Sequence, residues 1–504
     1  MESGFGRIRN PGLRHKVVTA DEAASWIRDG MTLGFSGFTR AGDAKAVPMA
    51  LVERAKKESF KINLYTGASL GSDTDRLFAE AGILRKRLPF QVDPVMRSAI
   101  NRGDIAFVDQ HLSETAEMVR QGVLEPPDFA VIEAVAITED NMIIPTTSAG
   151  NSLVFARHAK SVIVEINTAQ PAELEGMHDI YDAGRPGERE PIPIRRAGDR
   201  IGTIGIPAEA DKIRGIVFSH QPDSPSMVRP PDEETAMIAG HLIEFLRAEV
   251  AQGRLPANLA PLQAGIGTVS NAVLYGLLES EFADLEVYSE VLQDAVFDLM
   301  DAGKVKFASC CSITLSQEKM NRVFSRLDRY RDKIVLRPQD ISNHPEVIRR
   351  LGVIAINTAL ECDIYGNVNS THVMGTQMMN GIGGSGDFAR NARISIFVTK
   401  STAKGGSISS IVPFVSHVDS PEHDVDVIVT EHGYADLRGL SPRERAELII
   451  GRCAHPMYRR QLLAYYREAL ARGGHTPHVL EKAFSWHERY MRTGTMLEKV
   501  LQNI

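Results

Sequence analysis

The chain has few cysteines, no long apolar run and no excess of positive charge. Four cysteines occur among its 504 residues, and they show neither the spacing of a metal site nor a disulfide framework: Cys310, Cys311, Cys362 and Cys453. No apolar run reaches the length that a membrane-spanning helix needs. We therefore expect no metal, no disulfide and no membrane partner for this protein.

The charge and the first residues narrow the setting further. A net charge of -7 gives no electrostatic reason to expect nucleic-acid binding. Residues 1–7 lack the apolar core of a secretory signal peptide. Together with the sparse cysteines, these features predict a cytoplasmic protein in a reducing compartment.

Strand-like and helix-like runs alternate along both halves of the chain. Hydrophobic residues make up 43% of the chain and charged residues 24%, which is typical of a globular protein. The residues from Thr19 to Glu22 predict a capped helix start. Apolar runs typical of strands, several of them typical of buried parallel strands, occur at 31–35, 60–65, 129–134, 161–166, 352–356, 393–398 and 425–430. This alternation predicts an α/β fold.

A proline-rich segment divides the chain. Residues 221–231 contain four prolines and form the best candidate for a linker, and a long helix is expected after it, at about 232–252. A chain of 504 residues is too long for one ordinary core. We therefore predict an N-terminal α/β domain over 1–220 and a C-terminal α/β domain over 232–504.

The two predicted domains share a weak internal sequence similarity, which we call the echo. Residues 131–133 form an apolar run ending in an acid, and an Asp-containing turn and a polar segment of small residues follow. Leu360 and Glu361 begin a similar series. The echo predicts two similar open α/β domains, and a cleft between them would be a natural substrate site.

Glu290 lies at a predicted change of secondary structure. Residues 285–289 read as a short buried strand, whereas the apolar positions after Glu290 follow helical spacing until Gly303. The carboxyl end of a strand is where α/β proteins bind ligands. A helix dipole there would keep the carboxylate ionised, which suits a nucleophile. The alternative is a glutamate that only caps its helix.

Ser69 lies in a second candidate nucleophile motif. The segment Gly67–Gly71 matches the G-x-S-x-G elbow of α/β-hydrolases and follows a predicted strand. It comes early, however, and a capping run at 72–75 follows it rather than an obvious packed helix. No glycine-rich oxyanion segment with a histidine precedes it. A tight turn that lines the substrate site is the favoured interpretation.

Two glycine-rich segments are candidate ligand loops. Gly381–Gly386 satisfies G-x-G-x-x-G, but no strand precedes it and a strand-like run follows, which argues against a dinucleotide site. Its N–H groups could instead face one oxyanion, or it could be a surface turn. Gly265–Asn271 joins an apolar segment to a predicted helix, as anion cradles and plain turns both do.

Three further polar positions have open interpretations. Glu431 follows a predicted strand and could be a site residue or a solvated turn acid. Asn343 precedes a predicted helix and could be its N-cap. The histidines His475 and His478 lack a nearby partner acid or cysteine and are interpreted as structural or surface residues.

Several of these stretches together resemble one protein family. Residues 36–39, 288–293, 380–388, 430–433 and 435–440 are similar to motifs of the acetyl-CoA hydrolase/transferase family, and the resemblance covers nearly the whole chain in the same order. Within that family the chain looks like the CoA-transferases that act on succinyl-, acetyl- or propionyl-CoA.

The resemblance implies a class I CoA-transferase with two open α/β domains and an active site in the interdomain cleft. Glu290 matches the family nucleophile, which attacks an acyl-CoA thioester to form an acyl-glutamyl anhydride. The released CoA thiolate converts this into a glutamyl-CoA thioester, and a second carboxylate reverses the steps. The implied reaction is ping-pong chemistry with acetate or succinate as the short carboxylate.

The resemblance also assigns supporting residues. It implies that the Gly384 N–H stabilises an oxyanion and that Asn343 and Glu431 position or assist Glu290. Implied contacts of coenzyme A are Gly265, Ile266, Gly267, Thr268, Val269, Leu360, Asn380, Gly384 and Lys404. The family has a glutamine where this chain has His432, which leaves the tuning of the site around Glu431 open.

The resemblance implies no permanently bound cofactor, since coenzyme A is a substrate, and a homodimer as the assembly. Net hydrolysis of an acyl-CoA at the same site is the first alternative, because water could intercept an intermediate. A non-catalytic ligand-binding protein that uses the cleft is the second.

Overall fold

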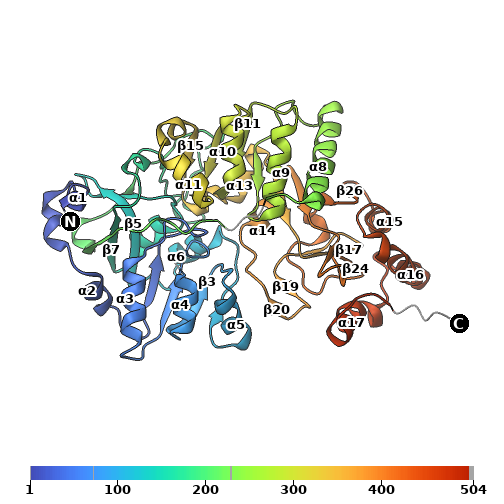
Figure 1. The fold of residues 1–504 in the computed structure, drawn as a ribbon, viewed down its shortest axis with the longest axis horizontal. Helices are drawn as coiled ribbons and strands as arrows, with labels where there is room; N and C mark the ends of the chain where they lie inside the picture. Colours follow the sequence, from blue (N-terminus) through green and yellow to red (C-terminus); the bar gives the residue numbers. More distant parts are fainter. Residues whose placement is uncertain (1, 72, 227–229, 499–504) are drawn as a thin grey trace.

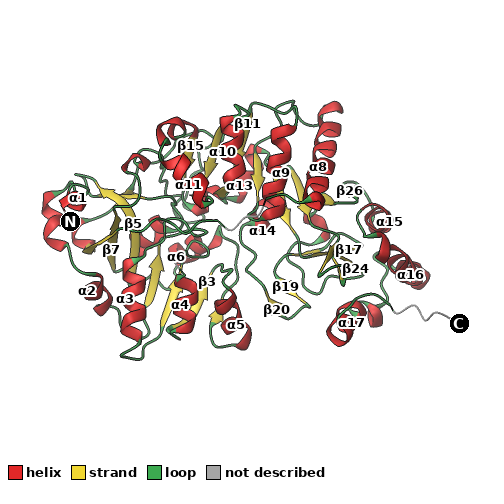
Figure 2. Cartoon of the chain, viewed as in Figure 1, coloured by secondary structure: helices red, strands yellow, loops and turns green. Residues whose placement is uncertain are grey.

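The structure is a computed structural model that describes residues 2–71, 73–226 and 230–498. It contains two large sheets with helices packed beside them (Figures 1 and 2). The nine-stranded sheet comes from the chain up to Ser219, and the eight-stranded sheet comes from the chain after Pro261. We call residues 2–219 the N-terminal half and residues 230–498 the C-terminal half. The predicted α/β fold with two open sheets is confirmed.

The first sheet is mostly parallel. Its parallel strands lie in the order β4-β3-β2-β1-β5-β7-β9, and β6 and β8 continue antiparallel from the end of β5. The strands are β1 (Thr32–Phe35), β2 (Ile62–Tyr65), β3 (Leu84–Leu88), β4 (Ala106–Phe107), β5 (Phe129–Ile137), β6 (Met142–Pro145), β7 (Ser161–Asn167), β8 (Ile206–Pro207) and β9 (Ile213–Ser219). The accompanying helices are α1 (Glu2–Phe5), α2 (Ala20–Ser25), α3 (Ala46–Ala55), α4 (Thr74–Glu80), α5 (Pro94–Arg102), α6 (Glu114–Gln121) and α7 (Ser152–His158).

The apolar runs are continuous because both faces of the sheet are buried. In β5, Ala130 and Ile132 belong to one hydrophobic cluster, whereas Phe129 and Val131 belong to another. Successive side chains of a strand point to opposite faces, so a strand covered on both sides is apolar at most positions. The strands predicted in this half are therefore confirmed, with ends that shift by a few residues.

The second sheet has the order β15-β13-β11-β10-β16-β21-β25-β26, and only β26 is antiparallel. Its strands are β10 (Leu262–Ala264), β11 (Leu285–Tyr288), β13 (Val305–Cys310), β15 (Ile334–Leu336), β16 (Ile354–Thr358), β21 (Ile394–Val398), β25 (Val427–Thr430) and β26 (Gly433–Asp436). The helices are α8 (Glu233–Ala251), α9 (Thr268–Glu279), α10 (Asp294–Asp301), α11 (Gln317–Phe324), α12 (Gln339–Ser342), α13 (Pro345–Leu351), α14 (Ser385–Asn391), α15 (Pro442–Arg452), α16 (Pro456–Arg472) and α17 (Ser485–Thr493).

Small sheets join the loops of the C-terminal half. The strand pairs are β12 (Val291–Leu292) with β14 (Ser312–Ile313), β19 (His372–Val373) with β20 (Gln377–Met378), and β22 (Thr402–Ala403) with β23 (Ile408–Ser409). A three-stranded sheet contains β17 (Glu361–Asp363), β18 (Val368–Asn369) and β24 (Ile411–Val412). Among the described residues, no helix combines the length and the apolar character needed to cross a membrane.

The two large sheets repeat one topology. In each, the first four parallel strands run outward in reverse order, and the later strands continue on the other side of the first. A hairpin, β5–β6 or β17–β18, follows in each half, which agrees with the sequence echo. One detail of the echo was wrong, since Glu133 lies within β5 rather than at its end. The order reverses between β1 and β5 and between β10 and β16, where α/β sheets bind ligands.

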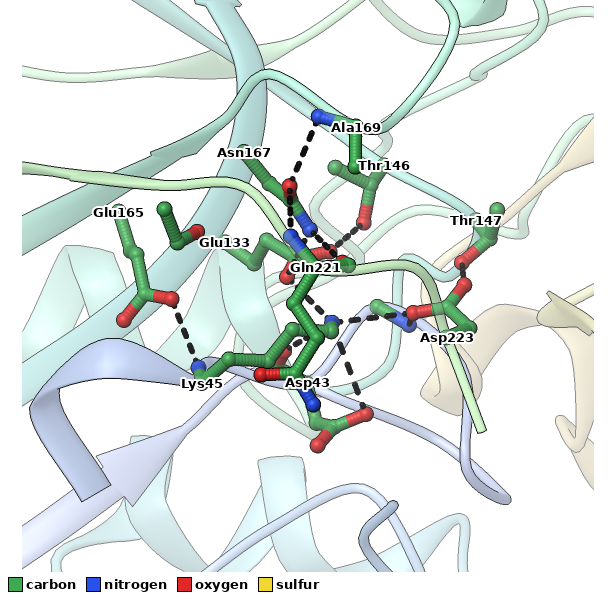
Figure 3. Close-up of polar contacts among 12 residues, drawn as sticks. Asp43, Lys45, Glu133, Thr146, Thr147, Glu165, Asn167, Ala169, Gln221 and Asp223 are labelled. Carbon is green, nitrogen blue, oxygen red and sulfur yellow. Dashed lines mark hydrogen bonds and ion pairs between the residues drawn. The ribbon is translucent and has the colours of Figure 1, made fainter. Parts of the chain in front are cut away.

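One residue of the predicted linker is buried against the N-terminal half, whereas the other described linker residues are exposed or half-buried. Asp223 is buried and accepts hydrogen bonds from Thr147 and, at 3.0 Å, from the Lys45 ammonium (Figure 3). The helix expected after the linker is α8, with Asp232 as its N-cap in a capping box. The part of the linker at 227–229 lies outside the described residues.

Candidate active site

A cavity of about 430 Å³ opens between the two halves. It lies at the carboxyl ends of the parallel strands, because the loops after β1, β2 and β3 meet the loops after β10, β11 and β16 there. The N-terminal half contributes Thr39, Arg40, Ser69, Phe90 and Val92. The C-terminal half contributes Gly265–Thr268, Glu290, Thr314, Asn357–Leu360, Ser370 and Asn380–Ser385, and Ser226 completes the lining. The predicted cleft between similar sheets is therefore present.

Glu290 lies on the wall of this cavity, between β11 and β12. Its backbone carbonyl accepts hydrogen bonds from the N–H groups of Cys311 at 2.8 Å and Ser312 at 3.0 Å. The sequence prediction that a helix begins at Glu290 was wrong, because Val291 and Leu292 form β12 and α10 begins at Asp294. A dipole of α10 therefore does not act directly on the carboxylate, and its surroundings decide its ionisation.

One amide holds the carboxylate of Glu290. Asn343 donates from Nδ2 to Glu290 Oε1 at 2.5 Å and lies 3.4 Å from Asp387 Oδ2. Asn343 Oδ1 accepts from the Ser342 hydroxyl at 3.0 Å, which fixes the orientation of the amide. The interpretation of Asn343 as a helix N-cap was wrong: it ends α12, and His344 precedes α13. The structure thus brings Asn343 and Glu290 together.

Burial dominates the ionisation of Glu290. The side chain is only 8% exposed, and its desolvation raises the pKa of Glu290 to about 7. The hydrogen bond from Asn343 lowers this pKa, and the nearby negative charge of Asp387 raises it. The expectation that a helix dipole keeps this carboxylate ionised was therefore wrong, because burial outweighs the hydrogen bond from Asn343 and raises the pKa.

Gly384 packs directly against this pair. A Cβ atom at this position would overlap Glu290 Oε1 and Asn343 Nδ2, although the φ of -93° suits any residue. The need for glycine is therefore one of space. The segment also precedes α14, a helix that the sequence analysis missed between the glycines and β21. An oxyanion contact from the Gly384 N–H remains a prediction, since no described hydrogen bond joins it to Glu290.

The predicted coenzyme loop is tied to the Glu290 segment. Gln293 donates to the Gly265 carbonyl at 3.0 Å and accepts from the Gly267 N–H at 3.3 Å. Gly267 has a φ of +126°, which favours glycine, and it precedes Thr268 at the start of α9. The loop between β10 and α9 therefore has a fixed position beside the nucleophile.

Some of the other predicted coenzyme contacts line the cavity and others do not. Leu360 and Asn380 line the cavity, as Ile266 does. Val269 packs against the hydrophobic core of the C-terminal half, and Lys404 is exposed at the turn of the β22–β23 hairpin. Neither lines the cavity, so their contacts with coenzyme A remain predictions.

Glu431 follows β25 as predicted but contacts other residues. It is buried and accepts hydrogen bonds from the backbone N–H of Ser401 at 2.8 Å and from the Ser401 hydroxyl. His432 Nε2 lies 3.4 Å from its carboxylate, and burial lowers the pKa of His432. No described hydrogen bond or ion pair joins Glu431 to Glu290, so its assistance remains a prediction.

Ser69 lines the cavity on the opposite wall. It is buried, and in the described part of the chain no hydrogen bond connects its hydroxyl to a histidine or an aspartate. A short helix, α4, does follow at Thr74, which the sequence analysis had not expected. The arrangement is that of a lining turn, not of a Ser-His-Asp triad.

Two polar residues near the site were missed by sequence reasoning. Asp387 accepts from the backbone N–H of Ser113 at 3.1 Å and from its hydroxyl at 2.6 Å, which joins α14 to the N-terminal half. Burial raises the pKa of Asp387 to about 6. Arg40 is the second residue. Asp387 lies within the recognised motif 380–388 and Arg40 directly follows the motif 36–39, and this was the available signal. The four cysteines are buried thiols, and no described cluster has the arrangement of a metal site.

Comparisons with known proteins show the family of this chain. Models of the acetyl-CoA hydrolase/transferase N-terminal and C-terminal domains match residues 8–217 and 320–466. A succinyl-CoA:acetate CoA-transferase from Clostridium kluyveri is 54% identical over 97% of this chain and 92% of its own. An acetyl-CoA hydrolase from Schizosaccharomyces pombe is 44% identical over 97% of this chain and 98% of its own.

A solved structure shares the fold. The 4-hydroxybutyrate CoA-transferase from Porphyromonas gingivalis superposes with a TM-score of 0.63 and 23% identity, covering 90% of this chain and 98% of its own. At this identity the likeness concerns architecture alone. The family models and the high identity of the relatives go further: this chain is an enzyme of the acetyl-CoA hydrolase/transferase family.

Proposed function

We propose that this enzyme moves CoA between a short acyl-CoA and a short carboxylate through covalent intermediates on Glu290. The observation that carries the proposal is a buried carboxylate on a cavity wall, held by one amide and crowded by a glycine. A glutamate that served only as a helix cap would need none of these contacts. The family assignment supports the same reaction class.

The first half-reaction is an acyl transfer to the enzyme. A Glu290 oxygen attacks the thioester carbonyl carbon, the C–S bond breaks, and CoA leaves as a thiolate. The thiolate then attacks the side-chain carbonyl of Glu290, and the first carboxylate departs. A glutamyl-CoA thioester remains, so the energy of the original thioester is retained.

The second half-reaction reverses these steps with another acid. The incoming carboxylate attacks the glutamyl-CoA carbonyl and expels the CoA thiolate, which gives a new anhydride. The thiolate attacks the acyl carbonyl of that anhydride, and Glu290 is released as a carboxylate. Each tetrahedral intermediate carries an oxyanion. The Asn343 amide supports Glu290 in this cycle, and we assign the Gly384 N–H as an oxyanion donor.

The coenzyme fits the wall formed by the C-terminal half. Gly265, Gly267 and Thr268 present backbone at the start of α9, a twelve-residue helix whose positive end faces the cavity. Leu360 and Ile266 offer apolar surface for the pantetheine arm. Lys404 is assigned to a phosphate, which it would reach from the outside of the site.

Net hydrolysis is the second candidate because the Schizosaccharomyces pombe relative is named an acetyl-CoA hydrolase. Water would then replace the second carboxylate at the same intermediates. The site residues are shared, so only the reaction separates the two candidates.

The test is the loss of acyl-CoA with and without acetate or succinate. The transferase proposal predicts that turnover depends on the added carboxylate and yields a new acyl-CoA in equal amount. Full turnover without any added carboxylate would instead establish a hydrolase.

A further inference from the structure

Arg40 is a cation on the wall of the cavity. It lines the same cavity as Glu290, and its Nε atom is buried without a hydrogen-bond partner. In the described ranges of the chain, no acidic side chain forms an ion pair with its guanidinium. An arginine that is partly withdrawn from water and lacks a partner offers a ready binding site for an anion.

The backbone holds Arg40 at the tip of a strained turn. Phe38 and Ala41 exchange hydrogen bonds at 2.9 Å and 3.2 Å, and the two residues between them, Thr39 and Arg40, have φ values of +49° and +70°. Positive φ at both central residues is the pattern of a type I′ turn, which favours asparagine and glycine. A threonine and an arginine there are strained, and such strain concentrates at functional sites.

A buried charge cluster fixes the end of this loop. Lys45 donates from Nζ to Glu133 at 2.5 Å and to Asp223 at 3.0 Å (Figure 3). Burial alone would lower the pKa of Lys45, but the surrounding carboxylates raise it well above its usual range. Asp223 also accepts from the Gly42 N–H at 3.2 Å. The turn that carries Arg40 is therefore attached to a rigid base.

The turn also contacts β14 and the residue after it, and β14 pairs with β12, the strand that follows Glu290. The Thr39 hydroxyl lies 3.2 Å from the hydroxyls of both Ser312 and Thr314. Ser312 in turn donates its N–H to the Glu290 carbonyl at 3.0 Å. Arg40 is therefore next to Thr39, the residue that connects this turn to the Glu290 segment through Ser312.

The repeated topology supports an anion-binding role. The loop with Arg40 follows β1, and the proposed coenzyme loop follows β10, the strand with the same place in the second sheet. Both loops line the cavity and both contain positive φ values. One loop presents glycine backbone to the coenzyme, whereas the other presents a guanidinium.

We propose that Arg40 binds the distal carboxylate of a dicarboxylic acyl group, and so selects acids such as succinate over acetate. The inference rests on the proposed function and names the substrate class for it. The distal carboxylate of a succinyl group lies two methylene groups from the reacting carbonyl, which Glu290 must reach. The phosphates of coenzyme A are separated from the thiol by the whole pantetheine arm, so they suit the opposite wall.

The test compares Arg40→Gln and Arg40→Lys with the wild-type full chain. We measure kcat/KM for succinate and for acetate as acceptors, and for succinyl-CoA and acetyl-CoA as donors. Loss of a charge-assisted, bidentate contact predicts that the dicarboxylate-to-monocarboxylate ratio falls about 10- to 100-fold in Arg40→Gln. Arg40→Lys retains the positive charge but not the planar guanidinium that binds a carboxylate through two N–H groups. An intermediate dicarboxylate-to-monocarboxylate ratio is therefore expected.

Arg76→Gln is the matched control. Arg76 lies on α4 and is ion-paired with Asp73 at 2.9 Å on the surface, so its removal should leave the ratio within about twofold. The inhibition constant of free CoA is measured for each variant as well. It should change little in Arg40→Gln.

Three results would overturn the proposal. The first is an unchanged ratio in Arg40→Gln. The second is an equal loss for all substrates together with weaker binding of free CoA, which would assign Arg40 to the coenzyme. The third is a wild-type enzyme that transfers CoA to acetate but not to succinate. A wild-type enzyme that transfers CoA to neither acid would instead refute the proposed function, and this inference with it.

Discussion

Ser69 and Glu290 occupy equivalent places in two sheets of the same topology. Ser69 lies in the loop after β2, Glu290 lies in the loop after β11, and both line one cavity. Their surroundings differ. Glu290 is held by Asn343 and packed against Gly384, whereas Ser69 has no described acid or histidine partner. The end of a strand therefore supplies a location, and the contacts around it supply the chemistry.

Truncation of each side chain to alanine should reveal the largest difference in rate between the two positions. Glu290→Ala should lower kcat by about 10⁴-fold or more, because the covalent route is lost. Ser69→Ala should lower kcat/KM by less than about tenfold, as expected for a lining hydroxyl. The measurement is the steady-state rate of CoA transfer, with CoA binding as the control for folding. Equal losses at both positions would erase the distinction.

The close packing around Glu290 can be tested next. Gly384→Ala should lower kcat by about 10²- to 10³-fold, because the new Cβ displaces the carboxylate or its amide donor. Gly240→Ala, at an open position on α8, is the matched control and should leave the rate unchanged. An active Gly384→Ala enzyme would mean that the observed packing does not matter for catalysis.

The pH dependence sharpens the comparison further. Glu290 reacts as a carboxylate, so kcat/KM should fall as pH decreases through about 7, the pKa to which burial raises it. Asn343→Ala removes a hydrogen bond that lowers this pKa. The fall of kcat/KM on the acid side of the pH profile, which we call the acid limb, should therefore move to higher pH. Asp387→Asn removes a negative charge that raises it, so the limb should move to lower pH. Shifts in the same direction would contradict this account.

The smallest effect is expected outside the cavity. Lys404 is exposed on its hairpin, so Lys404→Ala should raise the KM for acyl-CoA only about two- to fivefold. The effect should shrink at high salt, because exposed charges are screened. No change in KM at low salt would remove Lys404 from the coenzyme site.

The sequence predicted the large elements better than the local geometry. Buried parallel strands such as β5 and β21 are apolar at nearly every position, so the sequence predicted where they lie. The sequence did not predict the start of α10, because Val291 and Leu292 fit a helix face and a short strand equally well. The capping interpretation of Asn343 failed for a similar reason, since its contact with Glu290 crosses 53 residues of sequence. Arg40 was missed because an unpaired cation is visible only when its neighbours are known.

The central claim is that Glu290 carries the acyl group and then CoA during each turnover. The most direct measurement is mass spectrometry of the enzyme incubated with acyl-CoA and trapped with borohydride. This account predicts a modification confined to the peptide that contains Glu290. An unmodified Glu290 peptide, or a modified Ser69 peptide from an enzyme that turns over normally, would contradict it.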